Sequence, residues 1–136
     1  MADTVIKISG CPNSCGQHHI ANIGFHGGAK TVEGTAYPVY QLHLGGDVDG
    51  DGARFGKQVV KLFARRVPDA VVLLMRMFQS DHAEGETPRK FFARVDPKKV
   101  VATLQPLLGP PTAADASDID EEHGFLIHLG AGECAA

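Results

Sequence analysis

Long hydrophobic runs are absent from this sequence. The longest strongly apolar segment, AVVLLM at residues 70–75, is far shorter than the roughly 20 residues that a membrane-spanning helix requires. The first ten residues, MADTVIKISG, contain none of the basic start, apolar stretch and small-residue cleavage site of a secretory signal. We therefore expect a protein that neither crosses a membrane nor is exported.

An excess of one charge is absent too, and cysteine is scarce. The 136 residues include 13 Lys and Arg against 16 Asp and Glu, a balance that gives no reason to expect nucleic acid or an anionic membrane as partner. A hydrophobic content of 43% over this length is enough for one domain with its own core. An odd count of three cysteines favours a reducing, cytoplasmic setting, where paired thiols more often bind metal or do redox chemistry than form disulfides.

The first half of the chain has the patterns of a β-sheet. Alternation and β-branched residues predict strands over TVIKIS at 4–9, near Ile23 to His26 after a helical turn, over 37–46 and over KQVVKLFARRV at 57–67. The glycine- and aspartate-rich segment at 47–56 is expected to be a turn between two of these strands.

From Pro68 the hydrophobic period changes to that of a helix. Pro68 suits the first turn, Gly85 suits the stop, and one face is formed by Val71, Leu74, Met75 and Phe78. Two further helices are predicted from N-cap and proline pairs, which are Thr87 with Pro88 and Asp96 with Pro97. Pro106 should end or kink the last helix.

These elements predict an α+β fold, with a mixed or antiparallel sheet and two to three helices packed on one face. We expect one module over residues 1–108. The proline-, alanine- and acid-rich residues 109–124 are predicted to be a flexible, solvated linker, and residues 125–136 a short final strand and tail.

Cys11 and Cys15 lie in the stretch ISGCPNSCGQHHIANIGFHG, residues 8–27, on a glycine- and proline-rich loop. Two thiolates beside unpaired backbone N–H groups suit an iron–sulfur cluster. The spacing alone is equally typical of a turn with two free thiols. Zinc is a third interpretation, with His18, His19 and His26 as nitrogen ligands, but adjacent His18 and His19 cannot easily point at one ion.

The same stretch resembles, nearly residue for residue, the second cysteine half-motif of the sirohaem-dependent nitrite and sulfite reductases, GCPNSCG in this chain. The resemblance continues through YPVYQLHLGG, KLFARRVPDAVVLLMRMF and GETPRKFFARV, and covers roughly residues 5–105. It implies a C-terminal module in which Cys11 is a ligand of a 4Fe–4S cluster and Cys15 is the ligand that also bridges to the sirohaem iron. The residues that it implies around the cluster and the macrocycle are Asn13, Ser14, Gly16 and Gln17.

The activity that the resemblance implies is reduction of sulfite to sulfide or of nitrite to ammonia, with electrons from ferredoxin or a flavoprotein. The upstream C-x5-C pair of the family is absent here. We therefore expect the cluster and sirohaem only where an N-terminal half or another subunit supplies the missing ligands, and no turnover by the isolated chain. Cys134 is interpreted as an exposed thiol on a tail. The alternative is a detached, non-catalytic module that binds a partner or a metal.

Other polar clusters have a structural interpretation that we favour over a functional one. One basic cluster is able to face sirohaem carboxylates, but we favour the interpretation that it is the solvent face of a strand and its loop. It consists of Arg54, Lys57, Lys61, Arg65 and Arg66. Asp47, Asp49, Asp51 and Gly52 match the opening of an EF-hand calcium loop, yet Gln58 stands where that loop needs glutamate. His43 and His128 are expected to be packed or edge histidines.

Overall fold

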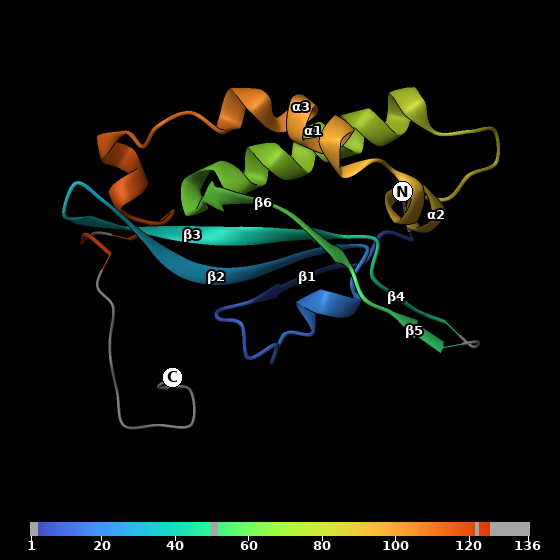
Figure 1. Cartoon of the computed structure of the whole chain (residues 1–136), viewed down its shortest axis with the longest axis horizontal. Coiled ribbons are helices and arrows are strands. Elements are labelled where there is room, and N and C mark those ends of the chain that lie inside the picture. The colour runs from blue at the N-terminus through green and yellow to red at the C-terminus, as the bar shows by residue number, and fades with distance from the viewer. Residues whose placement is uncertain (1–2, 50–51, 122, 126–136) are drawn as a thin grey trace.

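The structure is a computed structural model that describes residues 3–49, 52–121 and 123–125. Its centre is a four-stranded mixed sheet in the order β1-β2-β3-β6 (Figure 1). The strands are β1 (Ile6–Ser9), β2 (Ile23–Val32), β3 (Thr35–Leu44) and β6 (Lys57–Phe63). β1 runs parallel to β2, whereas β2 with β3 and β3 with β6 are antiparallel.

β2 and β3 form a long hairpin. The strand expected only near Ile23 to His26 continues to Val32, so this prediction was too short. The two turn residues, Glu33 and Gly34, have φ of 50° and 82°, and such positive φ angles at both centres match the twist of a two-residue hairpin. This turn pairs Val32 with Thr35, and the pairing extends the strand through residues of low strand propensity.

The first helical segment begins earlier than predicted, and the helices cover one face of the sheet (Figure 1). β6 ends at Phe63, a 3-10 turn η2 (Ala64–Arg66) follows, and α1 spans Val67–Asp81 with Pro68 in its first turn. The residues 64–67 are therefore not strand, contrary to the prediction. α1 also ends before Gly85, because the ring Nδ1 of His82 lies 2.8 Å from the Phe78 carbonyl oxygen and its backbone is extended.

Two short helices, α2 (Pro88–Arg94) and α3 (Pro97–Leu104), complete the helical layer. Both predicted N-caps are confirmed, since Thr87 Oγ1 accepts from Lys90 N at 3.4 Å and Asp96 Oδ1 accepts from Lys98 N at 2.9 Å. The core lies between helices and sheet, and its fully buried members include Ile23, Phe25, Leu42, Leu74, Phe91, Val100 and Leu104. The predicted α+β class with helices on one face is confirmed. No helix in the described part of the chain is long and apolar enough to span a bilayer.

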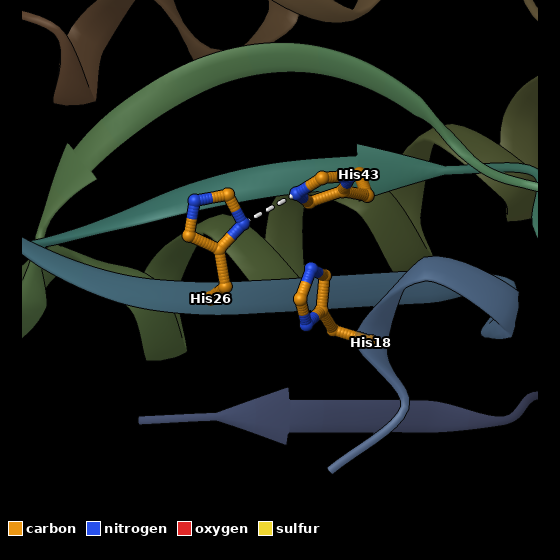
Figure 2. Close-up of side chains that lie close together, drawn as sticks. All are labelled: His18, His26 and His43. Atoms are coloured by element: carbon orange, nitrogen blue, oxygen red, sulfur yellow. Dashed lines mark hydrogen bonds between the residues drawn. The ribbon is translucent and has the colours of Figure 1, made fainter. Parts of the chain in front are cut away.

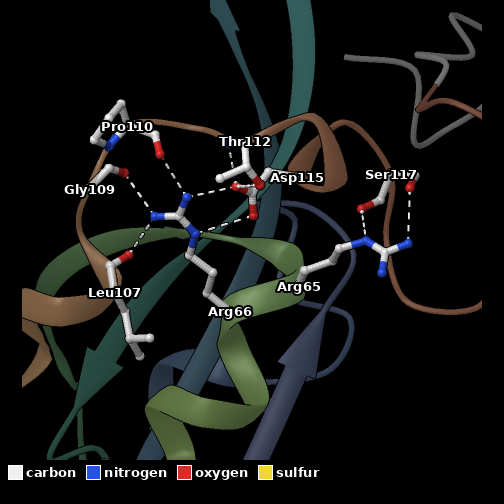
Figure 3. Close-up of polar contacts among 8 residues, drawn as sticks. All are labelled: Arg65, Arg66, Leu107, Gly109, Pro110, Thr112, Asp115 and Ser117. Atoms are coloured by element: carbon white, nitrogen blue, oxygen red, sulfur yellow. Dashed lines mark hydrogen bonds and ion pairs between the residues drawn. The ribbon is translucent and has the colours of Figure 1, made fainter.

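The segment after α3 is anchored to the rest of the fold over its first part. Two 3-10 turns, η3 (Gln105–Leu107) and η4 (Ala113–Ala116), follow α3, and η4 packs on β3. The Arg66 guanidinium donates to the carbonyls of Leu107, Gly109 and Pro110 and to the carboxylate of Asp115 (Figure 3). Asp115, Ser117 and backbone carbonyls thus tie this segment to Arg65 and Arg66, while residues 109, 110 and 112–114 are exposed, and the expectation of a flexible linker over 109–124 stays a prediction.

Only part of the C-terminal segment belongs to the described residues. Residues 119–121 are exposed, as expected for the acidic run. Of the predicted final strand and tail at 125–136, only Phe125 belongs to the described residues; Cys134 lies outside them. The boundaries of the module at 108 and 124 stay predictions.

Candidate functional site

The two cysteines lie on the loop that leaves the carboxyl end of β1 and enters a 3-10 turn, η1 (His18–Ile20). Two residues of this loop that are not glycine, Ser14 and Gln17, have left-handed φ angles of 64° and 58°. Such conformations cost free energy for ordinary side chains and persist only where the surroundings impose them. They flank Cys15 and Gly16, so the backbone around the second thiol is held in one unusual shape.

Hydrogen bonds within the loop and to β1 hold it in that shape. Ser14 Oγ donates to the Pro12 carbonyl at 3.1 Å, and Gln17 N donates to the Ser14 carbonyl at 2.7 Å. Gly16 N donates to the buried Ser9 Oγ at 3.1 Å. A Cβ on Gly16 would lie 2.2 Å from the Ile8 carbonyl oxygen, so only glycine lets the loop fold back onto β1.

Both thiols are free and accessible from outside. Cys15 is exposed, Cys11 is half-buried, and neither forms a disulfide. Among the other predicted site residues, Asn13 is exposed, and the exposed Gln17 accepts a 2.7 Å hydrogen bond from Lys7 Nζ. Thiolates are the protein ligands of iron–sulfur clusters, and a cubane cluster takes four. Cys11 and Cys15 are two thiols of the four that such a cluster requires.

An open depression of about 420 Å³ adjoins the cysteine loop. Two cations, Lys7 and Arg89, line it, and Arg89 Nε also lies 3.2 Å from Asp47 Oδ1. Its complete lining is Val5, Lys7, Gln17, Ile20, Asp47, Val48 and Arg89. Sequence analysis missed Lys7 and Arg89 as site residues, because β1 and the start of α2 meet only in the folded chain.

A group of three histidines lies on the sheet face opposite the helices (Figure 2). Ile23 and Phe25 face the helical core, so strand alternation turns Gly24 and His26 to the other side. On β3, Leu42 and Leu44 face the core and His43 faces away. Because β2 pairs with β3 in a register that sets Gly24 opposite His43, His26 and His43 are diagonal neighbours.

The third histidine, His18, reaches this face from η1. Its Nδ1 lies 2.8 Å from Ser9 Oγ, and its ring centroid is 4.8 Å from that of His26 and 4.7 Å from that of His43. Nδ1 of His26 lies 2.7 Å from Nε2 of His43, a hydrogen-bond distance. His43 is packed, as predicted. The group itself was missed, although the alternation of both strands and the two-residue turn between them contain the signal.

Burial lowers the pKa of all three rings. For His43 desolvation, with smaller contributions from the neighbouring histidines, lowers the pKa to about 4. Desolvation is also the main cause of the lowered pKa of His18 and His26, supplemented by His26 for the former and by the Lys61 cation for the latter. Burial therefore favours the neutral form of all three imidazoles.

The basic residues considered for sirohaem carboxylates divide into two groups. Arg54, Arg65 and Arg66 donate to backbone carbonyls within the chain, and Arg66 also pairs with Asp115. These three have structural roles. Lys57 and Lys61 are exposed on β6, which agrees with a solvent face.

The aspartate-rich loop is a hairpin, as expected for a turn between strands. β4 (Asp47–Asp49) pairs antiparallel with β5 (Gly52–Arg54). Strands therefore flank the loop where an EF-hand requires helices.

Comparison with known proteins places the chain in a family. It is 30% identical over 98 residues to the ferredoxin sulfite reductase 1 of Mycolicibacterium paratuberculosis, an alignment that covers 70% of this chain. The chain belongs to the nitrite and sulfite reductase family. It is also 35% identical over 101 residues to the ferredoxin sulfite reductase of Mycobacterium tuberculosis, which covers 67% of it, and no family model matches.

A solved structure agrees with this assignment. The Mycobacterium tuberculosis NirA protein superposes with a TM-score of 0.65 at 30% identity, over 71% of this chain. The alignments cover only 18% of the NirA chain and of the first relative, and 14% of the NADPH sulfite reductase haemoprotein β-component of Vibrio parahaemolyticus. The chain thus corresponds to a small part of these much longer family members.

Proposed function

We propose that this chain is a C-terminal cofactor-binding module of a sulfite or nitrite reductase. In this proposal Cys11 and Cys15 hold one side of a 4Fe–4S cluster, and Cys15 also bridges to the sirohaem iron. A missing N-terminal half or another subunit supplies the remaining ligands. When bound, the paired cofactors supply the electrons for multi-electron reduction of sulfite to sulfide or of nitrite to ammonia.

The observation that supports this proposal best is the shape of the cysteine loop. The left-handed residues Ser14 and Gln17 and the close approach of Gly16 to Ile8 hold two free thiols on one constrained turn. A turn that merely connects β1 to η1 has no need of two strained residues beside an exposed thiol. Pre-organised thiols, in contrast, bind a cluster without a further ordering cost.

An uncovered apolar surface on β1 supports the presence of a larger partner. Ile6 and Ile8 pair in register with Ile23 and Phe25 and so share the face that the helices cover. They are nevertheless 42% and 54% exposed, because the helical layer lies over β3 and β6 and leaves β1 bare (Figure 1). Apolar side chains beside an edge strand are typical of a surface that another segment covers.

The residues around the loop have definite tasks in this proposal. Lys7 and Arg89 offer cations to the carboxylates of a tetrapyrrole from the depression beside the loop. Gln17, held by Lys7, lies on the same wall. The electron donor that we propose is ferredoxin or a flavoprotein; the relatives include a ferredoxin sulfite reductase and an NADPH sulfite reductase haemoprotein. A cytoplasmic location is part of the same proposal.

The proposal can be tested by complementation. The chain would be co-expressed with the upstream part of the Mycobacterium tuberculosis relative from which the matching segment has been deleted, purified without oxygen, and assayed for iron, labile sulfide and sirohaem absorbance. We expect a stoichiometric cluster and a sirohaem band with both parts, and neither signal with the chain alone.

Matched variants identify the ligands. Cys11→Ser and Cys15→Ser should each abolish the cluster while the secondary structure is retained, whereas Ser80→Ala, on the exposed side of α1, should leave it intact. A complex that forms and stays colourless would disprove the proposal and favour the alternative of a detached binding module. A cluster that survives both cysteine variants would contradict the assignment of the ligands.

A further inference from the structure

The histidine group on the sheet face opposite the helices lies apart from the cysteines and offers several metal-ligating atoms. One ring nitrogen from each of His18, His26 and His43 lies within 4.8 Å of the others. His18 and His43 are only 3% and 5% exposed, and His26 is half-buried. Three neighbouring imidazoles from three different elements, two of them buried, form a donor set, since imidazole nitrogen is the commonest metal ligand in proteins.

We propose that His18, His26 and His43 bind one divalent first-row transition-metal ion, of the class of Zn²⁺, separately from Cys11 and Cys15. Three histidines leave a fourth tetrahedral position open to water or a small anion, as in three-histidine zinc sites. The ligand set at this place thus differs from the zinc interpretation of the sequence, because His43, and not His19, joins His18 and His26.

The distances require only small movements of the rings. In a tetrahedral site with metal–nitrogen bonds of about 2.05 Å, two nitrogens are about 3.3 Å apart. The His26 to His43 pair, now 2.7 Å apart, would open slightly, and the wider pairs would close. Rotation about χ2, a soft torsion for histidine, supplies such movements. At His26 and His43, metal binding would replace the hydrogen bond between the two rings with one metal–nitrogen bond from each ring.

The surroundings orient His18 for this role. Ser9 Oγ lies 2.8 Å from Nδ1 of His18, so a proton on Nδ1 donated to this oxygen leaves Nε2 free as a ligand. The backbone makes room as well, because a Cβ on Gly24 would lie 1.9 Å from the His18 carbonyl oxygen. Glycine at this position therefore lets η1 lie directly on β2, with the His18 ring beside the other two.

The charges on this face are compatible with a cation. Burial lowers the pKa of each ring, which favours the uncharged imidazole. Lys61 pairs in register with Gln41 and lies on the same face. Among the described residues it is the cation that lowers the pKa of His26, and its charge repels a bound metal ion. Lys61 is exposed, so solvent screens that repulsion.

The test removes the thiols first, since thiolates would compete for the same ions. The full chain with Cys11→Ser, Cys15→Ser and Cys134→Ser would be titrated with Co²⁺ and Zn²⁺, followed by optical absorption and by metal analysis after gel filtration. We expect one ion per chain, with cobalt bands of a nitrogen and oxygen ligand set and no sulfur charge-transfer band. Zn²⁺ should also raise the melting temperature of this variant.

Histidine variants in the same background assign the ligands. His26→Gln and His43→Ala should each weaken Zn²⁺ binding by more than the roughly 10–100-fold that loss of an outer-shell partner causes, and Ser9→Ala should fall within that range. His123→Ala, at an exposed position, is the control and should bind as the parent does. Circular dichroism checks that each variant is folded, and the half-buried His26 keeps the test valid if His43→Ala unfolds.

Two results would overturn the proposal. One is the absence of stoichiometric binding to the cysteine-free chain. The other is binding that His26→Gln leaves unchanged. Neither result bears on the proposed function, because cluster assembly is measured with Cys11 and Cys15 intact.

Discussion

Arg66 and Asp115 form a buried ion pair between the start of the helical layer and the segment that follows α3. Nη2 of Arg66 lies 2.6 Å from Oδ2 of Asp115, and Nε lies 3.2 Å from Oδ1 (Figure 3). The two side chains are only 15% and 4% exposed. Asp115 also accepts from Thr112 N and Thr112 Oγ1, which closes the capping box of η4.

Replacement of Asp115 should therefore destabilise the fold. Asp115→Ala leaves the Arg66 guanidinium without its counter-charge, and breaking a buried pair in this way costs about 3 kcal/mol. Urea unfolding followed by circular dichroism measures the loss. Asp120→Asn, an exposed acid of the same segment, is the control and should change the unfolding free energy by less than about 0.5 kcal/mol. Equal stability of the two variants would show that Arg66 needs only its carbonyl partners.

The same pair should make stability depend on pH. Burial by itself would raise the pKa of Asp115, but the hydrogen bonds from Arg66 and Thr112 outweigh it and hold this pKa below that of an unfolded aspartate. The unfolded chain then binds the proton first as the pH falls. The contribution is thus complete above the ordinary aspartate value of about 3.9 and is lost as the pH falls through the folded pKa.

Unfolding free energies from pH 7 to pH 2.5 test this prediction. The difference between the parent chain and Asp115→Asn should be constant at higher pH and should shrink below about pH 4, since only the parent still has a carboxylate to protonate. A difference that stays constant down to pH 2.5 would contradict the assigned direction of the pKa shift.

Gly24 should not tolerate a side chain. Its Cβ would lie 1.9 Å from the His18 carbonyl oxygen, so Gly24→Ala must push η1 away from β2, at a cost of about 1–3 kcal/mol by analogy with overpacked cores. Gly28→Ala on the same strand is the matched control, because its Cβ would find its nearest neighbour, Val39 Cγ2, at 4.0 Å. Thermal unfolding compares the two. Equal melting temperatures would mean that η1 can move freely.

The exposed apolar surface of β1, formed by Ile6 and Ile8, should contribute to binding of the upstream part of the reductase. Ile8→Lys places a charge on a surface that the proposed partner covers, and we expect at least about tenfold weaker binding in a pull-down titration. Its own stability should change by less than about 0.5 kcal/mol, because Ile8 is 54% exposed in the chain alone. Val72→Lys, at a 47% exposed position of α1, should bind normally. If Ile8→Lys binds as tightly as the parent chain, the exposed face of β1 is not part of the interface.

Several parts of the fold were predictable because their causes are local. Thr87 and Asp96 were identified as N-caps from the proline that follows each of them, and both accept the expected backbone hydrogen bonds. The loop with Cys11 and Cys15 was recognised from a continuous motif. The far end of β2 was missed, since residues such as Gly28 and Lys30 become strand only through their partners on β3.

The sequence by itself determined the family, the α+β class and the position of the cysteine loop, because motifs, hydrophobic periods and caps act over a few neighbouring residues. Only the tertiary structure decided which distant residues meet. The register of β2 on β3 sets His26 diagonal to His43, and η1 adds His18 to them. Likewise, Asp115 could look like part of a solvated acidic run until chain folding placed the Arg66 guanidinium beside it. Such contacts depend on pairing and packing between elements, which no local pattern encodes.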